Sequence, residues 1–242
     1  MQTQNLDKNA SFKFLCGPEL ECFTMCCQKL KLVLTPCDII KLKHFLKLSS
    51  DAFLDEYCDL RYDEGTFPLY YLEMNEDGKC PFVSPNGCTI YPARPAACRL
   101  YPIARGSSFV NIKRDVYFIL REEHCLGHGE GKFWTVSEWL SHEGLVEYDE
   151  VNNSWVQIVT SGSSVLKTHL EERIKMFLMV SYNLDKFKEF VFRSSFLKKF
   201  NLPLQKVQKI KEDDFELLKF GLKWLNLVLY GKQVQEITDL RA

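Results

Sequence analysis

The large apolar positions in the C-terminal half of the chain repeat every three to four residues. This period predicts two amphipathic helices, one ending near Tyr182 and one near Tyr230. The first has its stripe at Leu166, Leu170, Ile174, Phe177 and Leu178, and the second at Phe215, Leu218, Leu222, Leu225 and Leu229. We interpret both stripes as core-facing surfaces rather than cofactor contacts.

In the N-terminal half the apolar positions form shorter runs with clear start signals. TPCDIIKLKHFLK predicts a helix, because Thr35 can cap it, Pro36 suits the first helical position and Asp38 favours the positive end of the helix dipole. SSDAFLDEYCDL predicts a second short helix that begins after Ser49 or Ser50. Further along, TVSE at 135–138 is a capping-box pattern that opens another helix.

Two runs rich in aromatic and β-branched residues predict strands, TFPLYYLEM and FVNIKRDVYFIL. Pro68 favours a sheet edge for the first of them. Residues 79–106 are rich in Pro, Gly and Cys and show no period, so this segment needs something other than its own core to hold it.

The cysteines are confined to one end of the chain. All ten lie between positions 16 and 125, and none follows. We therefore predict an α+β, mainly helical protein of two parts. Residues 1–132 form a cysteine-rich metal-binding domain with a short antiparallel strand pair, and residues 133–242 form a helical region packed on it.

Composition narrows the chemistry of these thiols. The polar N-terminus lacks the basic start and apolar run of a signal peptide, and no stretch is long and apolar enough for a membrane span. We therefore expect a cytoplasmic protein, where thiols stay reduced and dense cysteines indicate metal binding or catalysis rather than disulfides. The net charge of −1 gives no general attraction to nucleic acid or anionic membranes. An unidentified protein partner stays possible.

One local charge excess stands out. Residues 186–211 carry eight lysines or arginines against a single acid, Glu189. This run can meet an acidic partner, but we favour the interpretation of a solvated helix face.

The cysteine spacing is C-x5-C-x3-CC at positions 16–27 and C-x7-C-x9-C at positions 80–98, followed by Cys125. Thiolate ligands favour zinc or an iron–sulfur cluster over magnesium or calcium. The absence of any C-x2-C pair argues against a standard zinc ribbon and a thioredoxin-like pair, and Lys29 breaks the C-x3-C-x2-C pattern of a radical-SAM cluster. We favour an iron–sulfur cluster and keep zinc as the alternative.

For the other residues near the cysteines, the sequence predicts a role less specifically. We interpret His124 and His128 as surface or supporting histidines rather than ligands. Cys37 and Cys58 lie among apolar neighbours of predicted helices, so we leave both out of the site. Three arginines near Cys98 can offset surplus thiolate charge or donate to sulfur, namely Arg94, Arg99 and Arg105.

The order of these motifs resembles a known family. CGPELECFTMCC, LTPCDIIKL, DAFLDEY, CPFVSPNGCTIYPARPAACRLYP and CLGHGEG occur here in the order typical of the YkgJ-type cysteine-cluster family, a zinc- or iron-chelating domain with a C-x2-C-x2-CC signature. The C-terminal pieces YNLDKFKEFVF and DDFELLKFGLKWL are similar to the longer bacterial members. The first cysteine block departs from the common form, with x5 and x3 in place of x2 and x2.

The resemblance implies which cysteines bind metal. Matched by position, the implied ligands are Cys16, Cys22, Cys26, Cys27, Cys80, Cys88, Cys98 and Cys125. The longer first loop leaves open which of the first four bind. Eight ligands suffice for two four-thiolate centres or for one cluster with spare thiols. We expect adjacent Cys26 and Cys27 to point in different directions and to serve different metal atoms.

Two functions from different classes follow. In the first, the protein is a redox or structural accessory protein that holds an iron–sulfur cluster or zinc. In the second, it is a metal-dependent protein-modifying enzyme, because the cysteine block is also similar to that of flagellin lysine methylases. We favour the first, since no general base, nucleophile or cofactor loop stands out beside the cysteines. Whether the protein is an enzyme, and which residues would be catalytic, stays open.

Overall fold

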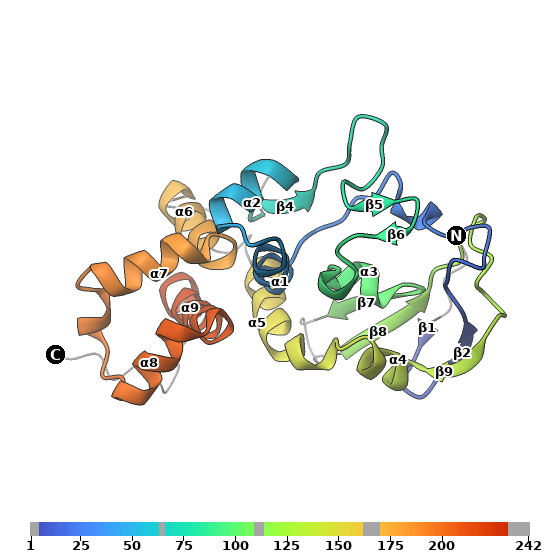
Figure 1. The fold of residues 1–242 in the computed structure, drawn as a ribbon. Helices are drawn as coiled ribbons and strands as arrows, with labels where there is room; N and C mark the ends of the chain where they lie inside the picture. Colours follow the sequence, from blue (N-terminus) through green and yellow to red (C-terminus); the bar gives the residue numbers. More distant parts are fainter. Residues whose placement is uncertain (1–4, 63–65, 109–113, 162–169, 232–242) are drawn as a thin grey trace. The chain divides into compact units, whose positions relative to one another are not determined.

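The computed structural model describes residues 5–62, 66–108, 114–161 and 170–231, and Figure 1 shows the fold. Its α-helices are α1 Pro36–Leu46, α2 Ser50–Tyr57, α3 Ala96–Leu100, α4 Val136–His142, α5 Asp149–Thr160, α6 Leu170–Ser181, α7 Leu184–Arg193, α8 Leu204–Glu212 and α9 Asp214–Tyr230. The predicted α+β, mainly helical class with a helical C-terminal part is confirmed.

The strands are short. They are β1 Asn5–Leu6, β2 Ser11–Phe14, β3 Cys58–Arg61, β4 Leu69–Leu72, β5 Val83–Ser84, β6 Gly87–Cys88, β7 Ile103–Ser108, β8 Arg114–Ile119 and β9 Lys132–Thr135. They form one three-stranded sheet in the order β1-β8-β7 and the two-stranded pairs β2-β9, β3-β4 and β5-β6. The two strands expected from the sequence correspond to β4 and β8, which lie in different sheets, and residues 109–113 of the second expected strand lie outside the described residues.

The chain divides into two compact units that interleave along the sequence. Unit 1 contains residues 1–33 and 72–149, and unit 2 contains residues 34–71 and 150–242. These cuts differ from the expected boundary at 132, because helices α1 and α2 pack with the C-terminal helices rather than with the cysteine-rich loops. The division into 1–132 and 133–242 as separate domains stays a prediction.

Unit 2 is built around the long helix α9, which packs against α1, α6, α7 and α8 (Figure 1). Its core includes fully buried Ile39, Phe177, Phe187 and Leu217. The predicted start of α1 is confirmed. The Thr35 side chain accepts from the Asp38 N–H at 3.2 Å, and the Asp38 carboxylate accepts from the Thr35 N–H at 2.8 Å. This double cap fixes the chain entry into α1.

Unit 1 has a core of its own between the sheets and α4. The β2-β9 pair runs in register from Ser11 opposite Thr135 to Phe14 opposite Lys132. Phe14 and Trp139 pack edge to face at 5.8 Å between ring centroids, and Tyr117 of β8 is fully buried in the same core. The capping box expected at TVSE is present, with Thr135 and Glu138 reciprocally bonded at the start of α4. This core positions the cysteine-bearing loops.

The other helices predicted from the sequence are also present in the structure. The last two predicted helices correspond to α6 and α9, although Leu166 lies outside the described residues. The helix after Ser49 is α2, with the Ser49 side chain as its cap. Across the described residues, no helix combines the length and apolar character needed to span a bilayer.

Candidate metal centre

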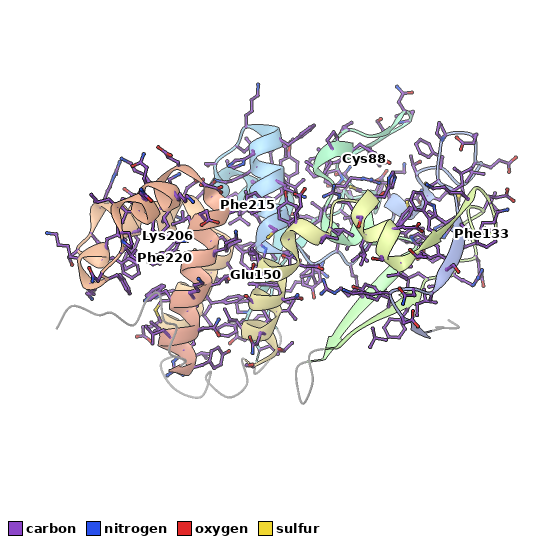
Figure 2. The ribbon with its side chains drawn as sticks, turned by 90° about the horizontal axis from the view of Figure 1, so that it is seen from below. Cys88, Phe133, Glu150, Lys206, Phe215 and Phe220 are labelled. Atoms are coloured by element: carbon purple, nitrogen blue, oxygen red, sulfur yellow. The ribbon has the colours of Figure 1, made fainter. Side chains whose placement is uncertain are left out.

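Four separate segments of unit 1 carry the eight candidate cysteines. Cys16 and Cys22 lie in the loop after β2, and Cys26 and Cys27 lie in the 3-10 turn Met25–Cys27. The others lie on a β-hairpin, a short helix and a loop, as follows: Cys80 before β5, Cys88 at the end of β6, Cys98 in α3 and Cys125 before β9. In Figure 2, Cys88 is labelled in the cysteine-bearing unit.

Backbone pairing brings the loop after β2 against the loop before β9. The Leu15 N–H donates to the Gly127 carbonyl at 3.1 Å, and the Gly129 N–H donates to the Lys13 carbonyl at 3.2 Å. The approach is so close that a Cβ at position 127 would lie 2.1 Å from the Leu15 oxygen. The paired backbones therefore hold Cys16 and Cys125 in neighbouring positions.

A second backbone pairing joins the first cysteine block to the second. The Cys80 N–H donates to the Cys27 carbonyl at 2.9 Å, and the Lys29 N–H donates to the Gly78 carbonyl at 2.7 Å. Lys29 takes a left-handed conformation with φ of 54°, which turns the chain away directly after the pairing. Cys27 and Cys80 are thus adjacent although 53 positions separate them in the sequence.

The β5-β6 hairpin places Cys88 beside the same loop. Val83 pairs with Cys88 across the hairpin. Gly87 has φ of 108°, a conformation that L side chains rarely adopt, and a Cβ there would lie 3.0 Å from Cζ of Phe23. The ring of Phe23, which stands between Cys22 and Cys26 in sequence, therefore packs directly on the hairpin.

Helix α3 is held in place by a hydrogen bond from α4. The indole Nε1 of Trp139 in α4 donates to the Leu100 carbonyl at the end of α3, at 3.0 Å. This bond fixes the short helix that carries Cys98 against the unit 1 core.

The electrostatics link these thiols into one neighbourhood. Burial, and then the sulfurs of Cys26, Cys125 and Cys22, raise the pKa of Cys16 to about 11. The pKa of Cys27 is raised, first by its hydrogen bond to Cys26, then by burial and by the charges of Cys26, Cys80 and Cys98. Burial raises the pKa of Cys80, and the charge of the neighbouring Cys88 adds to this effect. All eight candidate cysteines therefore belong to one connected group.

The adjacent pair has a geometry that the sequence did not suggest. The Sγ atoms of Cys26 and Cys27 lie 4.0 Å apart, and the hydrogen bond between them lowers the pKa of Cys26 to about 7. Consecutive Cα atoms are about 3.8 Å apart, so the two side chains run side by side. The expectation that they point in different directions is wrong. An S–S separation of about 3.8 Å is the edge of a tetrahedron with metal–sulfur bonds of about 2.3 Å, so the pair can serve one metal atom as well as two.

Backbone N–H groups point at several of the sulfurs. The Leu126 N–H donates to Sγ of Cys22 at 3.3 Å. Hydrogen bonds from the N–H groups of Phe82 and Val83 lower the pKa of Cys80, and one from Ile90 lowers that of Cys88, although burial leaves both pKa values raised. Such donors favour the thiolate, which is the form that binds metal.

Arg94 is the cation placed among these thiols. Its charge lowers the pKa values of Cys16, Cys26 and Cys88. The guanidinium stacks 3.6 Å from the ring centroid of Tyr91 and donates to Glu143 Oε2 at 3.0 Å. Two fixed partners therefore hold the arginine in place, and Glu143, which lies 49 positions away, could not be recognised from the sequence.

The other two arginines have different surroundings. Arg105 donates to Asp149 at 2.8 Å, and the guanidinium of Arg99 lies over Gly144, 3.1 Å from a Cβ built there. Arg94 is thus the arginine whose charge is seen to lower the pKa values of candidate thiols.

Two histidines and a tyrosine border Cys125. His124 pairs with Glu122 at 3.5 Å, and the ring of His128 packs 5.5 Å from that of Phe14, where burial lowers its pKa. Burial and then the neighbouring Cys125 raise the pKa of the Tyr101 hydroxyl. Tyr101 follows Cys98 in the C-R-L-Y-P motif, so the sequence held a signal for it that we did not use.

The two excluded cysteines lie in unit 2. Cys37 is buried in α1, and burial followed by the charge of Asp38 raises its pKa. Cys58 begins β3 near Tyr70 and Tyr182. Neither is among the neighbours named above that shift the pKa values of Cys16, Cys27 and Cys80.

The thiols are gathered but not arranged as a finished coordination sphere. Within the part of the chain that the structure describes, no group of three or more histidine, cysteine or carboxylate side chains stands in positions that could hold a metal ion. The donor set itself fits a soft metal, because it consists of thiols with N–H donors and one fixed cation around them.

Unit 2 contains a different kind of site, a pocket of about 550 Å³ between α5, α8 and α9 (Figure 2 labels Glu150, Lys206 and Phe220 of its lining). Its charged groups largely satisfy one another. Glu216 accepts from Lys219 at 2.8 Å and from Lys206 at 3.0 Å, and these bonds lower its pKa to about 2. No donor set for a metal lies there, so the cysteines of unit 1 remain the candidate site.

Comparison with known proteins supports the same segment. Residues 15–126 match the family model described as "CxxCxxCC: Putative zinc- or iron-chelating domain". No curated protein matches the chain, and no solved structure matches it. This match over residues 15–126 confirms the resemblance found in the sequence. The matched segment contains all eight candidate cysteines, whose individual roles as ligands stay a prediction.

Proposed function

We propose that unit 1 binds an iron–sulfur cluster, or failing that zinc, through Cys16, Cys22, Cys26, Cys27, Cys80, Cys88, Cys98 and Cys125, and that the protein is a redox or structural accessory protein. The observation that carries the proposal is the convergence of these thiols. Backbone hydrogen bonds join residues 13–15 to 127–129 and residues 27–29 to 78–80, and the Trp139 indole fixes the helix that carries Cys98, so that the cysteines become neighbours. Metal binding supplies the anchor that such loops need.

Each part of the surroundings has a role toward a bound metal. The N–H donors at Cys22, Cys80 and Cys88 stabilise thiolates, and Arg94 offsets part of their negative charge. An iron–sulfur cluster would supply one-electron transfer, whereas zinc would supply structure alone. We favour the cluster because four thiolates already saturate one structural zinc ion, and eight are gathered here.

The compartment follows from the same chemistry. Free thiols in this number persist where glutathione and thioredoxin keep them reduced, so we place the protein in the cytoplasm. The protein-modifying alternative stays a prediction, because no described residue beside the cysteines has a geometry that favours it over the accessory role.

The test is a metal analysis with matched cysteine variants. We expect protein purified without oxygen to contain iron and acid-labile sulfide and to absorb in the visible range. Cys27→Ser and Cys98→Ser should lose most of the metal, whereas Cys58→Ser should keep it. A colourless protein with stoichiometric zinc would replace the cluster by zinc, and equal metal retention in all three variants would remove the basis of the proposal.

A further inference from the structure

Apolar side chains are exposed directly beside the candidate ligands. Leu15, Met25 and Leu126 are chain neighbours of Cys16, Cys26 and Cys125, and all three are exposed, Leu126 to 50%. Tyr91, which covers Arg94, is exposed to 58%. Apolar groups left in water around a functional centre are typical of a surface that another molecule covers.

Two chain segments form this surface and lie side by side. The Leu15 N–H bonds to Gly127, and the Leu126 N–H bonds to the sulfur of Cys22. A Cβ at Gly131 would lie 2.8 Å from Cβ of Leu15. We call the surface made by residues 15–27 and 122–131, together with Tyr91, the cysteine face. Cys16 is itself an exposed residue of this face.

The charge of the cysteine face has a single sign. Its two segments contain five glutamates and no lysine or arginine, in a chain whose net charge is only −1. All five are exposed, namely Glu19, Glu21, Glu122, Glu123 and Glu130. Arg121 and Lys132 lie just outside the second segment, Lys13 and Lys29 lie just outside the first, and Arg94 is engaged by Glu143. Thiolates at the centre would make the face still more negative.

We propose that the cysteine face is the docking surface for a partner protein that presents lysine or arginine side chains around an apolar anchor. This inference rests on the proposed function, since the docked partner would lie against the edge of the metal centre at Cys16. Nucleic acid and anionic membranes carry the same sign of charge as the face and are repelled by it. A protein surface supplies both the positive charge and the apolar contact.

The probe is a synthetic peptide of lysine and leucine, with a glutamate–leucine peptide of the same length as its charge-reversed control. We expect binding of the lysine peptide by the metal-loaded full chain, weakening with salt, and no binding of the glutamate peptide. Hydrogen exchange should be slowed in residues 15–27 and 122–131 when the lysine peptide is bound.

Matched variants test the charge contribution. Replacing Glu19, Glu21, Glu123 and Glu130 by glutamine should weaken lysine-peptide binding about tenfold, since exposed pairs each contribute little. Replacing the exposed Glu171, Glu172, Glu189 and Glu212 of unit 2 removes the same charge elsewhere and should change binding less than twofold. Equal weakening in the two variants would overturn the proposal.

A second pair of variants tests the apolar contribution. Leu126→Ala should weaken binding, whereas Leu204→Ala, which truncates an exposed leucine of unit 2, should not. If the face were protected from exchange without peptide, and lost that protection on dilution, its occupant would be a second copy of the chain and the proposal would be wrong. Metal content is measured for every variant. A metal-free wild type would contradict the proposed function, whereas weak binding by a fully loaded wild type would contradict this inference alone.

Discussion

The backbone N–H of Cys80 donates to the backbone carbonyl of Cys27 at 2.9 Å. Together with the bond from Lys29 to Gly78, it joins the first cysteine block to the second, and both bonds depend on backbone atoms rather than on side chains. The neighbourhood of the thiols is therefore built into the fold of unit 1 before any metal is considered. Substitutions that disturb the backbone pairings should affect metal binding even where they spare every cysteine.

Gly127→Ala should disrupt the site, and Gly129→Ala provides its control. A Cβ at 127 would lie 2.1 Å from the Leu15 carbonyl oxygen, so the pairing that aligns Cys16 with Cys125 has to open. At Gly129, φ is 86° and nothing lies within 4 Å, so alanine there adds backbone strain of roughly 1 kcal/mol and no clash. We expect Gly127→Ala to lower metal content and the unfolding midpoint clearly more than Gly129→Ala. Similar losses in both would show that the close approach is unimportant.

Arg94→Gln should weaken metal retention without unfolding the protein. The arginine is the fixed cation beside Cys16, Cys26 and Cys88, and supporting residues of metal sites typically contribute about 10- to 100-fold in affinity. The measurement is the rate and extent of metal loss to a chelator. Arg61→Gln, which removes an exposed arginine that stacks on Tyr71 in unit 2, should behave as wild type. Identical chelator curves for the two variants would contradict the assigned role.

Unit 2 offers a test of a buried ion pair against an exposed one. Lys43 bonds to Asp185 at 2.8 Å and to Asp214 at 2.9 Å with only 4% of its side chain exposed, whereas Lys186 bonds to Asp51 at 2.7 Å with 61% exposed. Lys43→Met should lower the free energy of unfolding by about 3 kcal/mol, because it leaves a buried carboxylate without its main partner. Lys186→Met should leave it nearly unchanged in urea titrations. Equal effects would mean that burial does not decide the contribution.

The same cluster makes stability depend on acid. Burial raises the pKa of Asp214, but the hydrogen bond and charge of Lys43 outweigh it and hold the pKa below its ordinary value, and Asp185 behaves likewise. A carboxyl whose pKa is lower in the folded state stabilises it above the unfolded pKa, and that stabilisation disappears as pH falls through the folded value. Urea unfolding between pH 6 and pH 2 should therefore show a shallower acid loss in Asp214→Asn than in wild type. Parallel curves would contradict this assignment.

Elements with a local cause were predictable from the sequence. The caps at Thr35, Ser49 and Thr135 each rest on residues within three positions of the helix start, and all three are present. The stripes of α6 and α9 were equally clear, because one face of each helix meets the core. Helix α5 was missed, although Val151, Trp155 and Ile158 form a buried stripe at the same period.

Features that depend on distant contacts could not be predicted. The β2-β9 pair joins residues about 120 positions apart, and each strand is only four residues long, too short to give a clear signal by itself. Likewise, the cysteines could be grouped as one site by resemblance, but the pairing of Cys27 with Cys80 and the 4.0 Å separation of Cys26 and Cys27 follow from tertiary structure. The bond from Arg94 to Glu143 has no trace in local sequence for the same reason.

The most direct measurement is X-ray absorption at the metal edge of the full chain purified without oxygen. The account predicts a bound metal whose first shell contains only sulfur, at about 2.3 Å, and the loss of that signal in Cys27→Ser but not in Cys58→Ser. A first shell of nitrogen or oxygen ligands, or a wild type without bound metal, would contradict the claim that the gathered cysteines form a thiolate metal centre.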